Sequence, residues 1–111
     1  MNYTVPDKKI AKVLPKHYVM CTNENEAVAM AGGYWLARKK RANVYISADG
    51  FMNTLNFLTS WIIPDGLEMN LFISIGRTEK QHYIATGLVP KIIKKLKEYD
   101  ESERISYEFV K

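Results

Sequence analysis

The chain has 111 residues, a formal net charge of +4 and an apolar share of 47%. This length suits one domain with a modest core. Its apolar runs are too short to cross a bilayer, and residues 1–20 lack the apolar core of a secretory signal. We therefore expect a single soluble, cytoplasmic domain over residues 1–111, with no membrane partner.

The net positive charge would suit a nucleic-acid binder. The positions of the lysines and arginines instead favour ordinary roles in helices. Residues 38–41 fall at the expected end of a helix, where cations complement the helix dipole. The lysines of residues 91–97 alternate with apolar residues at helical spacing, as on the wet face of an amphipathic helix. We expect no nucleic-acid partner, and an unrelated nucleic-acid binder is the weakest of three hypotheses.

The residues that bind metals or form disulfides are few. Cys21 is the only cysteine, so no internal disulfide and no cysteine-based zinc site can form, and a small buried residue in a strand is its expected role. His17 and His82 have no metal-ligand spacing. We expect no metal site on this chain.

Apolar periodicity predicts alternating helices and strands. The elements in chain order are a helix between Asp7 and Pro15, a strand over 18–21, a helix over about 24–39, a strand over 44–47, a turn over 48–50, a helix over 51–62, a strand over 71–75, a helix over 89–99 and a strand over 105–110. Near-continuous apolar strands between helices are typical of parallel sheets. The expected fold class is α/β with three layers, a mostly parallel sheet with helices on both faces.

The helix over 24–39 carries unusually small residues. Gly32 and Gly33 weaken a helix by roughly 1 kcal/mol each, so we expect another backbone or a ligand to approach closely there. Residues at i, i+3, i+4 and i+7 should form the buried face of this helix, namely Ala27, Met30, Ala31 and Tyr34.

Ligands of parallel α/β sheets bind beyond the carboxyl ends of strands, where a strand passes into a helix. Three such junctions are expected here, at residues 22–26, 47–53 and 76–82. The first places Glu24 and Glu26 in the first turn of a helix. These three junctions are the places to look for a site.

Four segments carry a resemblance to one family. Asn23-Glu24 is followed by Ala27-Val28-Ala29-Met30-Ala31 and Gly33, and this run resembles the glutamate-bearing segment of the pyrimidine-binding domain in thiamine diphosphate-dependent decarboxylases. The closest likeness is to phosphonopyruvate decarboxylases, with sulfopyruvate decarboxylase next. Residues 3–7, 50–60 and 75–82 also resemble that family in order and spacing, so the resemblance covers nearly the whole chain.

The resemblance implies the thiamine diphosphate-binding fold and a set of site residues. Glu24 matches the glutamate that bonds the ring nitrogen of the aminopyrimidine, which makes it the catalytic residue. Asp7 matches a residue near the substrate. The cofactor contacts would be Glu24, Asp49, Gly50, Phe51 and Asn53. Glu26 is expected to be a solvated first-turn acid, because it points to another face of the helix.

The resemblance covers only half of the family's machinery, because the domain whose Gly-Asp-Gly segment holds magnesium and the diphosphate has no counterpart in this sequence. The chain would then be the pyrimidine-binding subunit of a decarboxylase, or lyase, for phosphonopyruvate or sulfopyruvate, both small anionic 2-oxo acids. It would need a separate diphosphate-binding β subunit that holds the magnesium, would be inactive alone, and would form a homo- or hetero-oligomer.

Two departures from the family keep an alternative open. Met52 stands where the family has a glycine, and the helix that precedes residues 3–6 in the family is lacking, as in a truncated domain. Both favour a degenerate, non-catalytic relative that acts as a partner-binding or regulatory module. Retention of Glu24 favours the enzyme.

Overall fold

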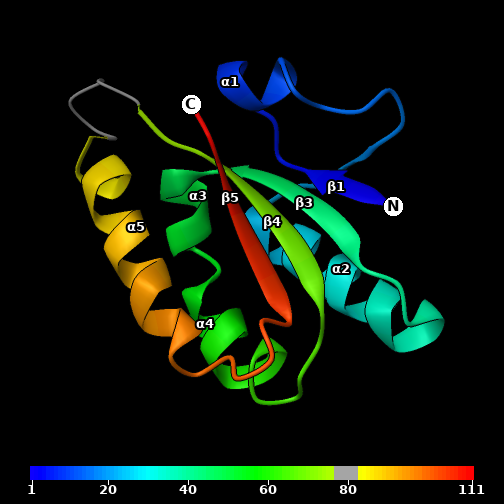
Figure 1. Cartoon of the computed structure of the whole chain (residues 1–111). Coiled ribbons are helices and arrows are strands. Elements are labelled where there is room, and N and C mark those ends of the chain that lie inside the picture. Colours follow the sequence, from blue (N-terminus) through cyan, green and yellow to red (C-terminus); the bar gives the residue numbers. More distant parts are fainter. Residues whose placement is uncertain (77–82) are drawn as a thin grey trace.

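The protein is described by a computed structural model that covers residues 1–76 and 83–111. Its centre is a parallel sheet with the strand order β2-β1-β3-β4-β5 (Figure 1). The strands are β1 (Asn2–Thr4), β2 (Val19–Met20), β3 (Ala42–Ser47), β4 (Met69–Ser74) and β5 (Ile105–Val110). The parallel α/β architecture expected from the alternating pattern is therefore confirmed.

Helices connect the strands. They are α1 (Lys8–Ala11), α2 (Glu24–Arg38), α3 (Ala48–Met52), α4 (Leu55–Phe57), the π-helical turn η1 (Leu58–Ile62) and α5 (Tyr83–Lys97). Among the described residues, no helix has both the length and the apolar character needed to span a membrane.

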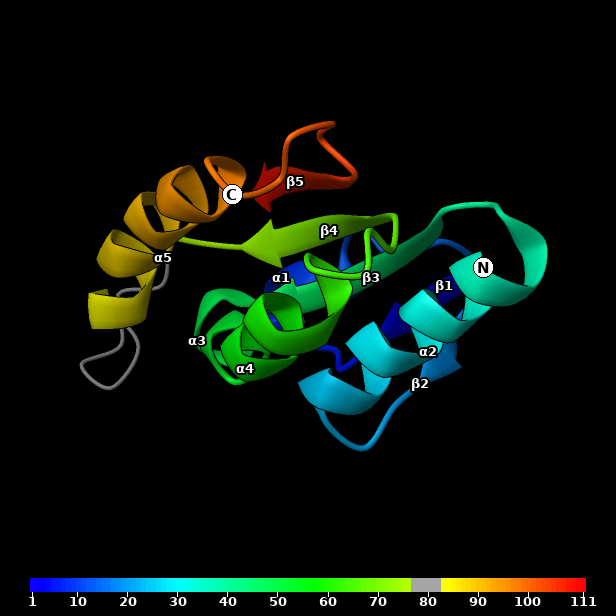
Figure 2. The same cartoon turned by 90° about the horizontal axis from the view of Figure 1, so that it is seen from below.

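The helices are unevenly shared between the two faces of the sheet. Figure 2 shows α2, α3 and α4 on one side, and α5 joins them by contributing to the same hydrophobic core. This core contains the inward side chains of the central strands, among them Val44, Ile46, Leu71 and Ile73. Ile10 of α1 and Tyr45 are buried outside this core. Among the described helices, α1 alone covers the second face.

The expected helices on both faces are therefore present only in part, and the side chains of the second face explain why. Asn43 donates to Asn2 and Asn70 donates to Asn43, each at 2.9 Å, which forms an amide ladder across three neighbouring strands. Tyr45 and Phe72 stack beside this ladder at 4.6 Å between ring centroids. A face with bonded polar side chains can meet water, so it does not require a full helical layer.

Several predicted boundaries were wrong. The predicted turn over 48–50 is the start of α3, because the Ser47 side chain caps that helix by accepting from Gly50 N at 3.1 Å. The predicted helix over 51–62 is interrupted at Thr54, whose hydroxyl donates to Phe51 O at 2.6 Å. The helix predicted from residue 89 begins at Tyr83. Strand β5 has the predicted bounds.

The N-terminal region also differs from the expectation. Strand β1 was missed, because a strand of three residues carries too little periodicity to be seen. The first helix is a single turn that ends at Ala11, well before Pro15, and Val13 beyond it is 44% exposed.

Helix α2 buries a face that is rotated from the predicted one. Its buried residues are Ala27, Val28, Ala31 and Gly32, whereas Met30 is 40% exposed. The close approach predicted at the two glycines is found at Gly32, where a Cβ would lie 3.1 Å from Leu67 and 3.2 Å from Ile62. The neighbours are core side chains. Gly33 is exposed with nothing within 4 Å of such a Cβ.

Candidate functional site at the carboxyl edge of the sheet

The order of the strands creates a switch point beside β1. The chain passes from β1 to β2 on one side, then returns across β1 to β3 on the other. Helices therefore leave the sheet in opposite directions from β1 and β3, and crevices outside the carboxyl ends of such strands bind ligands in open α/β sheets. In Figure 1 this edge lies at the top, near α1 and α3.

Glu24 lies at this edge, in the first turn of α2. The preceding Asn23 caps the helix, since its side chain accepts from Glu26 N at 2.9 Å. Glu24 Oε1 accepts a hydrogen bond from Asn53 Nδ2 at 3.2 Å. Gly50 lies against the same carboxylate, because a Cβ at Gly50 would be 2.7 Å from Glu24 Cγ and Oε2. Three predicted site residues from two distant junctions are therefore in contact.

The other residues predicted from the second junction lie close in the chain but have different surroundings. Asp49 is half-buried in the first turn of α3. Phe51 is fully buried and packs edge-to-face on Tyr107, with ring centroids 6.3 Å apart. Its side chain belongs to the core, so only its backbone can border a ligand. Met52 is half-buried and also packs against the core.

Asp7 reaches the same edge from the other face of the sheet. Its Oδ1 accepts from Ile10 N at 2.7 Å and caps α1, while its Oδ2 accepts from the Ser74 hydroxyl at 2.9 Å. Ser74 is the last residue of β4. Asp7 thereby holds α1 over the carboxyl ends of the strands, which is a structural role in addition to the predicted one.

Lys9 adds a cation that the sequence did not single out. This half-buried lysine donates from Nζ to Ile75 O at 2.6 Å, and a Cβ at Gly76 would lie 2.9 Å from its Nζ. Its neighbour Lys8 is exposed. Lys8 and Lys9 look alike in the sequence. The signal that could distinguish the half-buried one from the exposed one is their position in the helical turn relative to the buried Ile10.

Glu26 is the exposed first-turn acid that the sequence predicted, and it also makes bonds that were not predicted. It is exposed, and its carboxylate accepts from Thr22 N at 3.3 Å and from the Thr22 hydroxyl at 2.9 Å. These bonds tie the start of α2 to the preceding chain, in the manner of a capping interaction. Glu24 and Glu26 therefore serve different purposes in one helical turn.

Cys21 and His17 are not part of the Glu24 contacts described above. Cys21 is buried after β2, as predicted for a small core residue, and burial raises the pKa of its thiol. His17 is exposed in the connection between α1 and β2. His82 and most of the third predicted junction lie outside the described residues. Within those residues, no group of three or more histidine, cysteine, aspartate or glutamate side chains is arranged to hold a metal ion.

The contacts at this edge define what it can do chemically. A half-exposed carboxylate, oriented by an amide and lying against a glycine, can accept a hydrogen bond from a flat ligand. No protein-family model matches the chain, and no curated protein matches it either.

Proposed function

We propose that this chain is the pyrimidine-binding subunit of a thiamine diphosphate-dependent 2-oxo acid decarboxylase. It acts on phosphonopyruvate or sulfopyruvate together with a separate diphosphate-binding subunit. The observation that supports the proposal is the contact of Glu24 with Asn53 and Gly50 at the carboxyl edge of the sheet. In the family that the sequence resembles, a glutamate at the corresponding position bonds the aminopyrimidine ring.

The residues present fit such a ring. Glu24 offers a carboxylate that can accept a hydrogen bond from a ring N–H, and it is half-exposed, so a ligand can reach it. Gly50, which lacks a Cβ, gives the Glu24 side chain room to lie against the start of α3. The Met52 side chain packs against the core, so its replacement of a family glycine does not by itself fill this space.

Three residues of the chain would have separate roles in the reaction. Glu24 would hold or release the proton at the ring nitrogen, and Asn53 would keep its carboxylate in one orientation. Once bound, the cofactor's thiazolium supplies the electron sink for the loss of carbon dioxide. Lys9 would attract the anionic substrate, since an ammonium has three N–H donors and Ile75 O accepts from one of them. Magnesium and the diphosphate are assigned to the partner subunit.

A degenerate, non-catalytic module is the second candidate, and one observation favours it. Glu24 is already hydrogen-bonded within the chain by Asn53, and Asp7 uses both carboxylate oxygens to hold α1. Carboxylates with such contacts can serve the fold alone. In that case the carboxyl edge would bind another protein without turnover.

Co-expression separates the two candidates. The chain would be produced with a small protein from the same genome that carries Gly-Asp-Gly followed by an asparagine, and carbon dioxide release would be measured with phosphonopyruvate and sulfopyruvate in thiamine diphosphate and magnesium. We expect turnover with both proteins present and none with either alone. A stable complex with neither turnover nor bound cofactor supports the non-catalytic module, and absence of any such partner protein overturns the proposal.

A further inference from the structure

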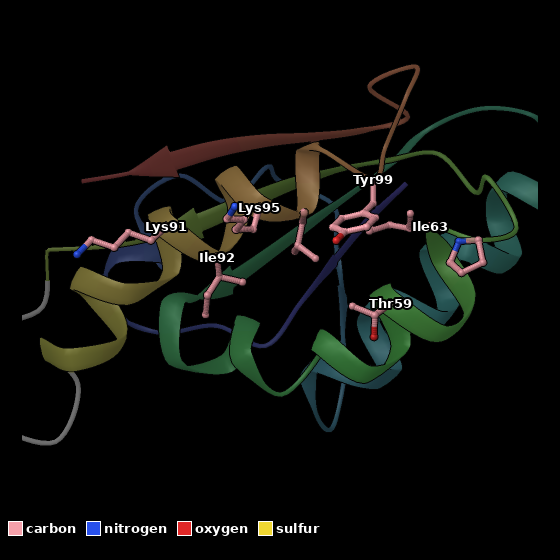
Figure 3. A pocket seen from close by; sticks show the side chains of 8 residues that line it. Thr59, Ile63, Lys91, Ile92, Lys95 and Tyr99 are labelled. Carbon is pink, nitrogen blue, oxygen red and sulfur yellow. The ribbon is translucent and has the colours of Figure 1, made fainter.

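An apolar groove lies away from the carboxyl edge, between α5 and the turn that follows η1 (Figure 3). Its volume is about 810 Å³. Ile63 and Pro64 form part of one wall, and Ile92 and Tyr99 form part of the other. In Figure 1, α5 descends toward the end of the molecule where α4 lies, which is opposite the end that holds α1 and α3. The groove is therefore separate from the Glu24 contacts.

Helix α5 carries two apolar stripes. One faces the core and consists of Ala85, Val89, Ile93 and Leu96. The second continues from the groove toward the start of the helix and consists of Ile84, Leu88 and Ile92, which share one side at helical spacing, and it is extended by Tyr99 in the turn just beyond the helix. Ile84 is 65% exposed and Tyr99 is 74% exposed. Exposed apolar residues aligned along a helix mark an interaction surface more often than isolated ones do.

The length of this second stripe favours a helix as its occupant. At about 1.5 Å of rise per residue, α5 extends roughly 20 Å from Ile84 to its last residue, Lys97, and Tyr99 follows in the turn beyond it. Ile84 and Leu88 lie on the stripe beyond the residues that line the groove itself. A small ligand would fill the groove and leave these two uncovered, whereas a helix along α5 would cover the whole stripe.

The charge beside the stripe determines which helix fits. Lys91 and Lys95 line the groove, and the sequence of α5 contains four lysines and no acid. Glu98, just beyond the helix, lies 3.6 Å from Lys95 as an exposed pair, which is weak. A second copy of α5 would bring lysines against lysines. Acidic residues on a partner would complement them.

We propose that the α5 groove binds an amphipathic helix of another protein, whose apolar stripe is flanked by glutamate or aspartate. The partner helix lies along α5, its apolar residues enter between Ile63 and Ile92, and its acids meet Lys91 and Lys95. This is the helix-in-groove mode of recognition. The inference does not depend on the proposed decarboxylase function, because it involves a different part of the molecule.

Two labelled peptides test the proposal. Each is a helical peptide of about 18 residues, long enough to cover the stripe, with leucines on one face. Glutamates flank the leucines in one peptide and lysines flank them in the other. Fluorescence anisotropy with the full chain should show saturable binding of the acidic peptide that is at least roughly tenfold tighter than binding of the basic one.

Matched variants locate the binding. The double substitution Lys91→Glu and Lys95→Glu should reverse the preference between the peptides, whereas Lys39→Glu with Lys40→Glu, at the exposed end of α2, should leave it unchanged. Tyr99→Asp should weaken the binding of the acidic peptide by roughly tenfold, as expected for the loss of an aromatic interface residue. Leu36→Asp is its control, since Leu36 is 52% exposed on another helix. Circular dichroism confirms that each variant is folded.

Three results would overturn the proposal. The first is that neither peptide binds, or that both bind equally. The second is a dimer of the chain in sedimentation that Tyr99→Asp dissociates, which would make a second copy the occupant. The third is displacement of the acidic peptide by decanoate at a stoichiometry of about one, which would indicate a site for an acyl anion.

Discussion

Glu24 and Glu26 illustrate how two acids in one helical turn acquire separate roles. Glu26 bonds to Thr22, four residues earlier, and so acts within the helix start. Glu24 bonds to Asn53, which is 29 residues away in the chain and follows a different strand. The sequence pattern could distinguish them because they point to different faces of the helix. It did not single out Lys9, whose Nζ donates to Ile75 O just beyond the end of β4.

The first prediction concerns these two acids. In the reconstituted complex, Glu24→Gln should lower kcat by about 10²-fold or more, because glutamine can still accept from Asn53 but cannot exchange a proton. Glu26→Gln should change kcat by less than about threefold, since a glutamine also serves as a capping partner. Steady-state kinetics with circular dichroism would measure both. Unchanged turnover in Glu24→Gln would exclude the catalytic role.

The second prediction concerns the glycine against Glu24. In Gly50→Ala the new Cβ would meet Glu24 Cγ and Oε2 at 2.7 Å, so the carboxylate must move away from its bond to Asn53. We expect turnover to fall by about tenfold or more, while the free energy of unfolding changes by less than about 1 kcal/mol, because alanine favours the helix that contains it.

Gly87 in α5 provides the matched control for that substitution. It is exposed, and no described residue lies within 4 Å of a Cβ placed there. Gly87→Ala should raise the free energy of unfolding in urea by about 0.5–1 kcal/mol and leave turnover unchanged. A Gly50→Ala enzyme with full activity would show that Glu24 does not need its observed position.

At the level of the elements, apolar runs located every described strand except the three-residue β1. Strand β5 has the predicted bounds because its composition leaves no competing pattern. Helix α2 was found, but its buried face includes Val28 in place of Met30, since small residues on several sides leave the periodicity ambiguous. The start of α3 was predicted as a turn because Asp-Gly is also a common turn pair. In the structure the Ser47 side chain caps a helix at this position.

The third prediction tests the face that α2 buries. Gly33→Ala should stabilise the protein by about 0.5–1 kcal/mol, because Gly33 is exposed with free space around it. In Gly32→Ala the Cβ would contact Leu67 and Ile62 at 3.1 and 3.2 Å, so core side chains must shift. That strain should cancel or exceed the helix gain. Urea unfolding of the pair measures the difference, and equal gains would contradict the observed packing.

The fourth prediction concerns Tyr107 in β5. Its hydroxyl is buried without a hydrogen-bond partner among the described residues, and burial, followed by the nearby charge of Asp100, raises the pKa of this phenol. The folded state therefore favours the neutral phenol. Its contribution to stability is complete below the usual tyrosine pKa of about 10 and is lost as the pH rises above that value.

Tyr107→Phe removes both the unpaired hydroxyl and its titration. We expect a gain of about 1 kcal/mol in the free energy of unfolding at neutral pH, and a smaller loss than in the unmodified chain when the pH is raised above about 10. Tyr99→Phe, on an exposed residue, should alter neither. Urea unfolding at both pH values provides the measurement, and a loss of stability at neutral pH would indicate that the hydroxyl has a partner.

At the scale of the whole molecule, the sheet is covered by helices on one face and by the single turn α1 on the other. The sequence predicted the parallel sheet, because buried parallel strands are apolar on both sides. It did not predict the open face, since Asn43 and Asn70 look like isolated polar residues until the register places them side by side. Long-range register is the information that a local pattern lacks.

The last prediction uses the separation of the two proposed surfaces. If a diphosphate-binding subunit covers the Glu24 contacts, hydrogen exchange of the complex should slow in residues 22–26 and 48–53, which border the carboxyl edge. Residues 59–64 and 88–99, which border the α5 groove, should exchange as in the free chain, because their backbone contacts do not change. The acidic peptide should give the reverse pattern.

Sedimentation velocity on the same samples would establish the stoichiometry. Protection of the groove alone by the subunit would remove the support for the decarboxylase, and protection of neither region by the subunit would count against the carboxyl edge as its interface.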